Sequence, residues 1–150
     1  MRRIICVAIV CLLSITVLAL VYSKHTEFEE KSKLVRLVLE ERMKSDPVEG
    51  SLLIVETPLI SNLDLPSDVG GVQVMLITMD QLKAQGRSST SIHAILFTNI
   101  TLIDSLNGFI YFSTYYGSYW PDIWNQKWEF YFKKILGVWV IDSKIHGELL

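Results

Sequence analysis

Three histidines and a few aspartates are the side chains best suited to proton transfer in this chain. The histidines are His25, His93 and His146, and none has a partner at a metal-binding or catalytic spacing. His93 falls in an expected strand, and on the concave side of a sheet it could approach Asp104 or Asp142. Such a pair could act as a general acid and base, although a structural role for His93 is the simpler interpretation. The sequence has no phosphate loop, nucleophile elbow or paired metal motif. We therefore expect no enzymatic activity, no cofactor and no metal.

Both cysteines lie near the N-terminus, within an apolar segment. They are Cys6 and Cys11, and the remainder of the chain has none. The domain that follows can therefore use neither a disulfide nor a zinc site built from thiolates. Acylation is one interpretation of these cysteines. The alternative is that they serve as small hydrophobic residues.

Aromatic residues are concentrated in one part of the chain. Twelve of the sixteen lie between Phe109 and Phe132. Those in the expected strands belong to the core by default, whereas those around the loop near Pro121 are harder to bury. Loop aromatics suit a ligand cleft, a protein interface or contact with the membrane surface, although the loop could instead fold over the core. The candidate binding residues are Tyr115, Tyr116, Tyr119, Trp120 and Trp124.

Net charge argues against a nucleic-acid partner. The whole chain carries a formal charge of -2. Arg2 and Arg3 precede the apolar segment, so the residues after it sum to -4. Nucleic-acid binding needs a basic face, which a weakly acidic domain does not provide.

The apolar segment from Ile4 to Tyr22 predicts a transmembrane helix, because it is uncharged and long enough to cross the hydrocarbon core. A cleaved signal peptide is the alternative, which would leave a secreted soluble protein. Arg2 and Arg3 favour a cytoplasmic N-terminus and an extracytoplasmic C-terminal domain. We thus expect a single-pass membrane protein with residues 1–23 as the anchor and residues 24–150 as one domain. Asn99 begins a glycosylation sequon, which matters only in a eukaryotic secretory protein.

Beyond the anchor, the pattern predicts one helix followed by strands. The helix spans Glu27 to Lys44, with Thr26 and Glu29 at the spacing of a capping box. A second capping box at Thr78 and Gln81 predicts one or two helical turns over Met79 to Gln85, and the alternative is that the preceding strand simply continues. The expected strands cover residues 51–56, 72–78, 91–103, 109–116, 126–133 and 138–144.

Two features of the strand region are more specific. Asn107-Gly108 is a strong hairpin-turn signal. In residues 126–133, Trp128, Phe130 and Phe132 alternate with polar or amphipathic residues, so one face of this strand should be buried.

These elements predict an α+β fold, in which the transmembrane helix is followed by one helix packed on a curved antiparallel sheet of about five or six strands. The terminal segments KWEFYFKK and GVWVIDSKIHGEL resemble the closing hairpin of nuclear-transport-factor-2-like domains, and the order of elements is also similar to the cystatin-like fold. That resemblance implies a concave sheet face that holds small ligands, binds partners or forms dimers. Such domains usually have two or three N-terminal helices, and only one is clear here.

The functional interpretation is a membrane-anchored, non-enzymatic binding or assembly module, with a protein partner or a homodimer as the occupant of the sheet face or the aromatic loop. Replacing Trp120 and Trp124 with alanine should then weaken association and leave the fold intact. The alternative is a small-molecule-binding or enzymatic domain that uses a pocket in the sheet with His93 and an aspartate.

Overall fold

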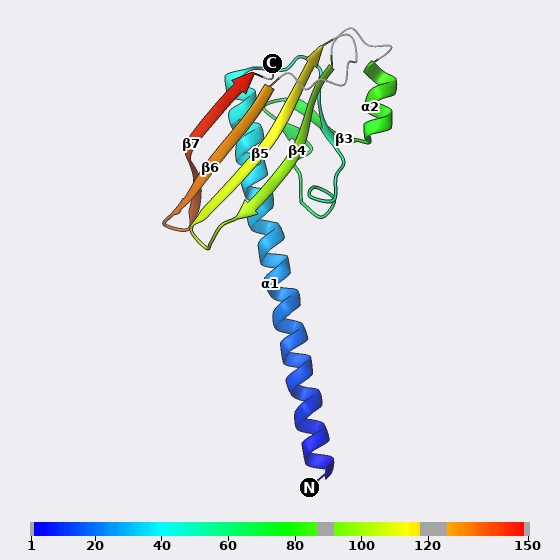
Figure 1. The fold of residues 1–150 in the computed structure, drawn as a ribbon, viewed down its shortest axis with the longest axis vertical. Helices are drawn as coiled ribbons and strands as arrows, with labels where there is room; N and C mark the ends of the chain where they lie inside the picture. The colour runs from blue at the N-terminus through cyan, green and yellow to red at the C-terminus, as the bar shows by residue number, and fades with distance from the viewer. Residues whose placement is uncertain (1, 87–91, 118–125, 149–150) are drawn as a thin grey trace.

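The structure is a computed structural model that describes residues 2–86, 92–117 and 126–148, without the side chains of residues 2–12, 116 and 148. A long helix is followed by seven strands and one short helix (Figure 1). The elements are α1 (Arg2–Ser45), β1 (Ser51–Val55), β2 (Asp68–Val69), β3 (Val72–Ile77), α2 (Met79–Gly86), β4 (Ile92–Leu102), β5 (Asn107–Gly117), β6 (Gln126–Ile135) and β7 (Val138–Glu148).

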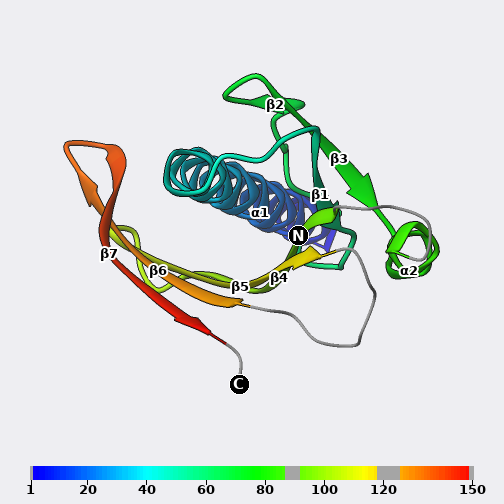
Figure 2. The same cartoon turned by 90° about the horizontal axis from the view of Figure 1, so that it is seen from above.

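The seven strands form one sheet that curls around the C-terminal half of α1 (Figure 2). Their order is β2-β3-β1-β4-β5-β6-β7, and β1 runs parallel to both β3 and β4. The prediction of an antiparallel sheet with five or six strands is therefore wrong, while the α+β class holds. The chain leaves β1, crosses to β3, and returns through α2 to β4 on the other side of β1. Such crossovers join parallel strands, whereas a tight hairpin joins antiparallel ones.

Four of the five residues of β1, Leu52 to Val55, are apolar because both faces of this strand are buried. Leu52 and Ile54 face the main core beneath α1, and Leu53 and Val55 face a smaller cluster beneath α2. On α1, the residues that enter the main core recur at helical spacing. They are Leu34, Val35, Val38, Leu39 and Met43.

Helix α1 has no break where the sequence predicted a new helix to begin. The Thr26 hydroxyl donates a hydrogen bond to the Tyr22 carbonyl, 2.9 Å away and four residues earlier. Thr26 is therefore an interior helical residue, and the predicted start at Glu27 is wrong. The second capping box is confirmed: the Thr78 amide donates to Gln81 Oε1 at 2.9 Å, and the Gln81 amide donates to Thr78 Oγ1 at 3.2 Å.

Among the residues that the structure describes, no helix is both long enough and apolar enough to cross a membrane. This finding contradicts the predicted transmembrane segment from Ile4 to Tyr22. It equally contradicts the predicted single-pass arrangement with a cytoplasmic N-terminus.

The hairpin between β4 and β5 differs from its prediction. Its turn lies at residues 103–106, where Asp104 Oδ1 accepts hydrogen bonds from the amides of Leu106 (2.7 Å) and Asn107 (2.8 Å). Asn107 and Gly108 are instead the first residues of β5. Gly108 is needed for another reason, because a Cβ there would lie 2.6 Å from Leu34 Cδ1. Helix α1 thus packs closely on the sheet at this glycine.

The predicted alternation in β6 is confirmed. Trp128, Phe130 and Phe132 are buried in the main core, with 7%, 0% and 2% of their surface exposed. The residues between them lie on the outer face of the sheet, which explains why this strand alternates while β1 does not.

Candidate functional site

A carboxylate on α1 joins the helix to the last hairpin of the sheet. Glu30 accepts hydrogen bonds from Trp139 Nε1 at 2.6 Å and from Lys33 Nζ at 2.6 Å, and it forms an ion pair with Lys134. Lys134 lies in β6 and Trp139 in β7, so residues more than a hundred positions apart in sequence converge on one side chain. We call Glu30, Lys33, Lys134 and Trp139 the Glu30 cluster.

The electrostatics of the Glu30 cluster indicate a structural role. Burial of the carboxyl raises its pKa, but the hydrogen bonds from Lys134, Lys33 and Trp139 outweigh this effect and lower the pKa of Glu30 from 4.5 to about 2. The carboxylate is only 14% exposed. A carboxylate this acidic stays ionised at neutral pH, which suits a fixed ion pair and not a proton donor.

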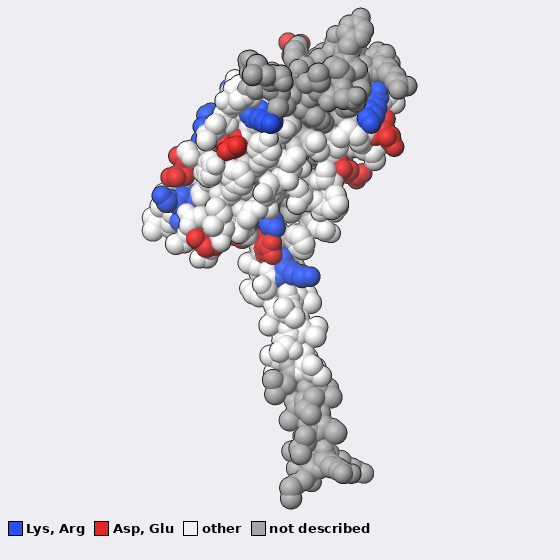
Figure 3. Space-filling model, viewed as in Figure 1, with Lys and Arg blue, Asp and Glu red and all other residues white. Residues whose placement is uncertain are grey.

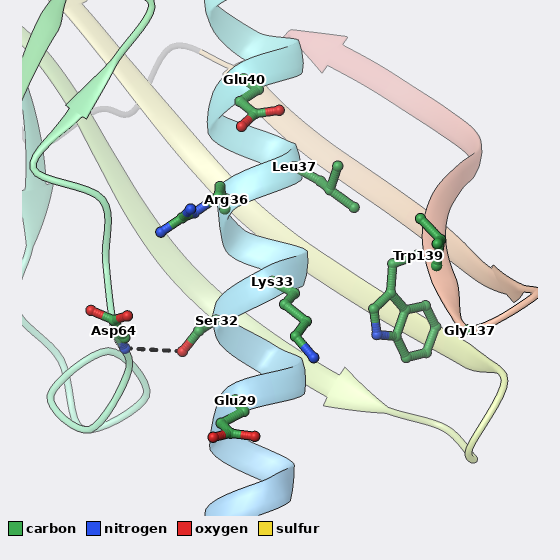
Figure 4. A pocket seen from close by; sticks show the side chains of 10 residues that line it. Glu29, Ser32, Lys33, Arg36, Leu37, Glu40, Asp64, Gly137 and Trp139 are labelled. Carbon is green, nitrogen blue, oxygen red and sulfur yellow. Dashed lines mark hydrogen bonds between the residues drawn. The ribbon is translucent and has the colours of Figure 1, made fainter.

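A groove of about 670 Å³ lies beside this cluster, between α1 and the start of β7 (Figure 4). Its apolar side consists of Leu37, Val138 and Trp139. The Ser32 hydroxyl accepts a hydrogen bond from the Asp64 amide at 2.9 Å, which holds the segment before β2 against the helix. The remaining lining residues are Glu29, Lys33, Arg36, Glu40 and Gly137.

A second hollow of about 420 Å³ shares residues with this groove. Arg36, Glu40 and Asp64 line both, and the second hollow extends to residues 65–69. Together they follow one face of α1 between the two edges of the curled sheet (Figures 2 and 4). We call this combined surface the edge groove.

The N-terminal half of α1 projects beyond the sheet (Figure 1). Its described residues 13–22, here called the stem, are uncharged (Figure 3). Seven large apolar side chains on it are exposed by 57–77% of their surface: Leu13, Ile15, Val17, Leu18, Leu20, Val21 and Tyr22.

Four exposed apolar residues lie on two turns at the end of the sheet from which the stem emerges. Ile103 and Leu106 belong to the β4–β5 turn and are 62% and 56% exposed. Ile135 and Leu136 belong to the β6–β7 turn and are 52% and 99% exposed. We call these four residues the collar.

His93 is not brought together with either of its predicted partners. It faces α1 from β4. Burial lowers the pKa of its imidazole. The negative charges of Asp46 and Glu49 raise this pKa, whereas the positive charge of Arg42 lowers it further. Asp104 instead bonds to the turn at the other end of β4. Asp142 lies on β7 and pairs with Lys133 at 3.6 Å. His93 therefore does not pair with Asp104 or Asp142.

One of the charged groups near His93 is the buried Arg42, which is 5% exposed. Arg42 donates to the Asp46 carboxylate at 2.5 Å and to the Asp46 carbonyl at 2.9 Å, and its guanidinium lies 5.5 Å from the centre of the Trp128 ring. These contacts close the C-terminal end of α1 onto the sheet. Among the described residues, Arg42 Nε is buried and has no hydrogen-bond partner.

The predicted aromatic site is described only in part. Tyr115 is 3% exposed and packs in the cluster beneath α2, where burial raises the pKa of its phenol. Tyr116 lies in β5 opposite His93, without a described side chain. Tyr119, Trp120 and Trp124 lie outside the described residues, so their role in binding stays a prediction.

Sequence reasoning missed the Glu30 cluster, the edge groove and the collar. In the sequence, Glu30 is one of many charged residues on the expected solvent-exposed face of a helix. No local sequence pattern connects it with Trp139. The collar gave a weak signal, because Leu106, Ile135 and Leu136 are apolar residues at expected turns, where polar residues are usual. In the part of the chain that the structure describes, no group of His, Cys, Asp and Glu could hold a metal ion.

Comparisons with protein-family models, with curated proteins and with solved structures found no match to this chain. The resemblance to nuclear-transport-factor-2-like and cystatin-like domains therefore stays a prediction. The function must be argued from the surfaces described above.

Proposed function

We propose that this protein is a non-enzymatic assembly module whose copies associate through the stem and the collar. The observation that carries this proposal is the exposure of seven large apolar side chains on residues 13–22. A helix that is apolar on all sides is normally covered by other structure. Here the stem continues from a helix whose other half is fixed in the core, so it projects as a rigid element.

The stem favours a bundle of copies over a simple pair. Burying one large aliphatic side chain contributes about 1.5–3 kcal/mol. The side chains of the stem are already partly covered, so covering the stem completely would contribute about 8 kcal/mol per copy. Covering one side of the stem would contribute about 4 kcal/mol. Association costs about 4–15 kcal/mol in lost translational and rotational freedom. A pair that covers one side of each stem would therefore be only marginally stable. Three or more parallel stems would cover most of the apolar surface of each stem.

The collar supports a parallel arrangement. Its two turns lie at the end of the sheet from which the stem projects (Figure 1). When stems lie side by side in the same direction, the collars of neighbouring copies meet and extend the apolar contact. Leu136, which is 99% exposed, would then be covered together with Leu18 and Val21.

The test measures the mass of the full-length chain in detergent-free buffer by sedimentation equilibrium. We expect an oligomer of three or more copies that dissociates when Leu18 and Val21 are both replaced by glutamate. Lys44→Glu, at the opposite end of α1, is the control and should leave the mass unchanged. A chain that is monomeric at micromolar concentration, an oligomer indifferent to the two glutamates, or a monomer that binds phospholipid vesicles would each overturn the proposal.

The second hypothesis is a small-molecule or enzymatic site in the concave face of the sheet. That face packs against Leu34, Val35 and Val38 of α1. The structure therefore offers this hypothesis no separate support.

A further inference from the structure

Strand β7 has one edge without a strand partner among the described residues. It is the last strand in the sheet order and pairs only with β6 along its eleven residues. The opposite edge of the sheet is β2, with two residues. A long free edge presents a row of backbone N–H and C=O groups, and another extended polypeptide is the ligand that matches such a row.

The edge groove lies beside this free edge. The sheet curls around α1 without closing, so that β7 and β2 lie on opposite sides of the helix (Figure 2). Gly137 and the first two residues of β7, Val138 and Trp139, line the groove (Figure 4). A strand added to β7 would thus place one of its faces over the exposed surface of α1.

The charge of the edge groove favours basic side chains on the face of the added strand that lies over α1. Its acidic residues are Glu29, Glu40, Asp64 and Asp68, and its basic residues are Lys33 and Arg36. Lys33 is already engaged by Glu30 at 2.6 Å. The groove therefore carries an excess of negative charge, which complements lysine or arginine.

The outer face of β7 selects apolar side chains. Trp139 and Ile141 pack toward the main core, so Val140 between them points outward, where it is 37% exposed. Lys144 bonds to Glu41 of α1, and the next residue, Ile145, is 54% exposed. Cross-strand neighbours of Val140 and Ile145 gain most when they are β-branched and apolar.

We propose that β7 binds an extended segment of another protein in which basic and β-branched apolar side chains alternate. The backbone of this segment pairs with the free edge of β7. Its basic side chains lie over the edge groove near Glu40 and Asp64, and its apolar side chains lie beside Val140 and Ile145. This surface is separate from the stem and the collar, so the proposal does not depend on self-association.

The test uses the full-length chain and a labelled, end-capped peptide of alternating valine and lysine, followed by fluorescence anisotropy. We expect saturable binding to the valine–lysine peptide and binding at least about tenfold weaker to a valine–glutamate peptide of equal length. Methylating every second backbone nitrogen blocks one edge of the peptide. Of the two alternately methylated peptides, one should lose binding and the other should retain it.

Charge reversal in the groove provides the matched test on the protein. Glu40→Lys should weaken binding of the valine–lysine peptide by about tenfold. Glu56→Lys changes an exposed carboxylate that does not line the groove and should leave binding unchanged. Circular dichroism checks that both variants are folded.

Three results would overturn the proposal. One is the absence of saturable binding to the valine–lysine peptide. Another is equal binding of the lysine and glutamate peptides, or equal effects of the two protein variants. The third is retention of binding by both methylated peptides, because that would exclude backbone pairing with β7.

Discussion

Replacing Glu30 with glutamine tests whether the Glu30 cluster stabilises the packing of α1 on the sheet. The substitution removes the negative charge opposite Lys33 and Lys134. It keeps a side-chain oxygen that can accept the hydrogen bond of Trp139 Nε1, now 2.6 Å from the carboxylate. The decrease in the free energy of unfolding on substitution therefore reports mainly the contribution of the negative charge.

The size of the effect follows from the pKa of Glu30. Its pKa in the folded protein is about 2, against an ordinary value of 4.5, and each pKa unit corresponds to about 1.4 kcal/mol. The ionised carboxylate thus contributes up to about 3 kcal/mol to the free energy of unfolding. Because glutamine keeps part of the hydrogen bonding, we expect Glu30→Gln to lower the free energy of unfolding by about 2 kcal/mol at neutral pH.

The pH dependence has a definite sign. A carboxyl whose pKa is lowered by folding stabilises the protein fully above its ordinary pKa, and this contribution disappears as the pH falls from 4.5 toward 2. Urea unfolding of both proteins, followed by circular dichroism, should therefore give a smaller difference at about pH 3 than at pH 7.

Glu41→Gln is the control, because Glu41 forms a more exposed pair with Lys144 at 2.7 Å. Such pairs contribute about 0–1 kcal/mol. If Glu30→Gln is as stable as the original protein at pH 7, or if the difference is the same at both pH values, then the Glu30 cluster does not stabilise the fold as described.

Two further substitutions test local packing and capping. Gly108→Ala places a Cβ against the buried side chain of Leu34, and we expect it to lower the free energy of unfolding by about 1–3 kcal/mol. Gly147→Ala is the control, because no atom lies within 4 Å of the added Cβ. It should have a much smaller effect in the same urea titration. Thr78→Ala removes the hydroxyl that accepts the Gln81 amide at 3.2 Å and should cost about 1 kcal/mol; an unchanged thermal midpoint would show that this cap contributes nothing.

The sequence alone was sufficient where the structural signal is local. Alternation in residues 126–133 placed Trp128, Phe130 and Phe132 in the core, because neighbouring side chains of a strand point to opposite faces. The capping box at Thr78 and Gln81 located the start of α2, because capping involves backbone groups within one turn.

Similar local signals were misleading where a longer element overrode them. The Thr26–Glu29 spacing fits a helix start, but these residues lie inside α1, whose backbone already satisfies the groups that a cap would serve. Asn107-Gly108 fits a turn, but Asp104 forms the turn and Gly108 accommodates α1. In both cases the residue types were compatible with two structures, and contacts outside the motif decided between them.

Only the tertiary structure determined the strand order and the surfaces proposed for binding. The buried strand β1 has apolar residues on both faces, and this pattern does not specify that it pairs in parallel with β3 and β4. Glu30 and Trp139 meet although 109 positions separate them, and the groove beside them exists because the sheet curls around α1. Hydrophobic periodicity shows which side of an element is buried, whereas its neighbours depend on how the whole chain packs.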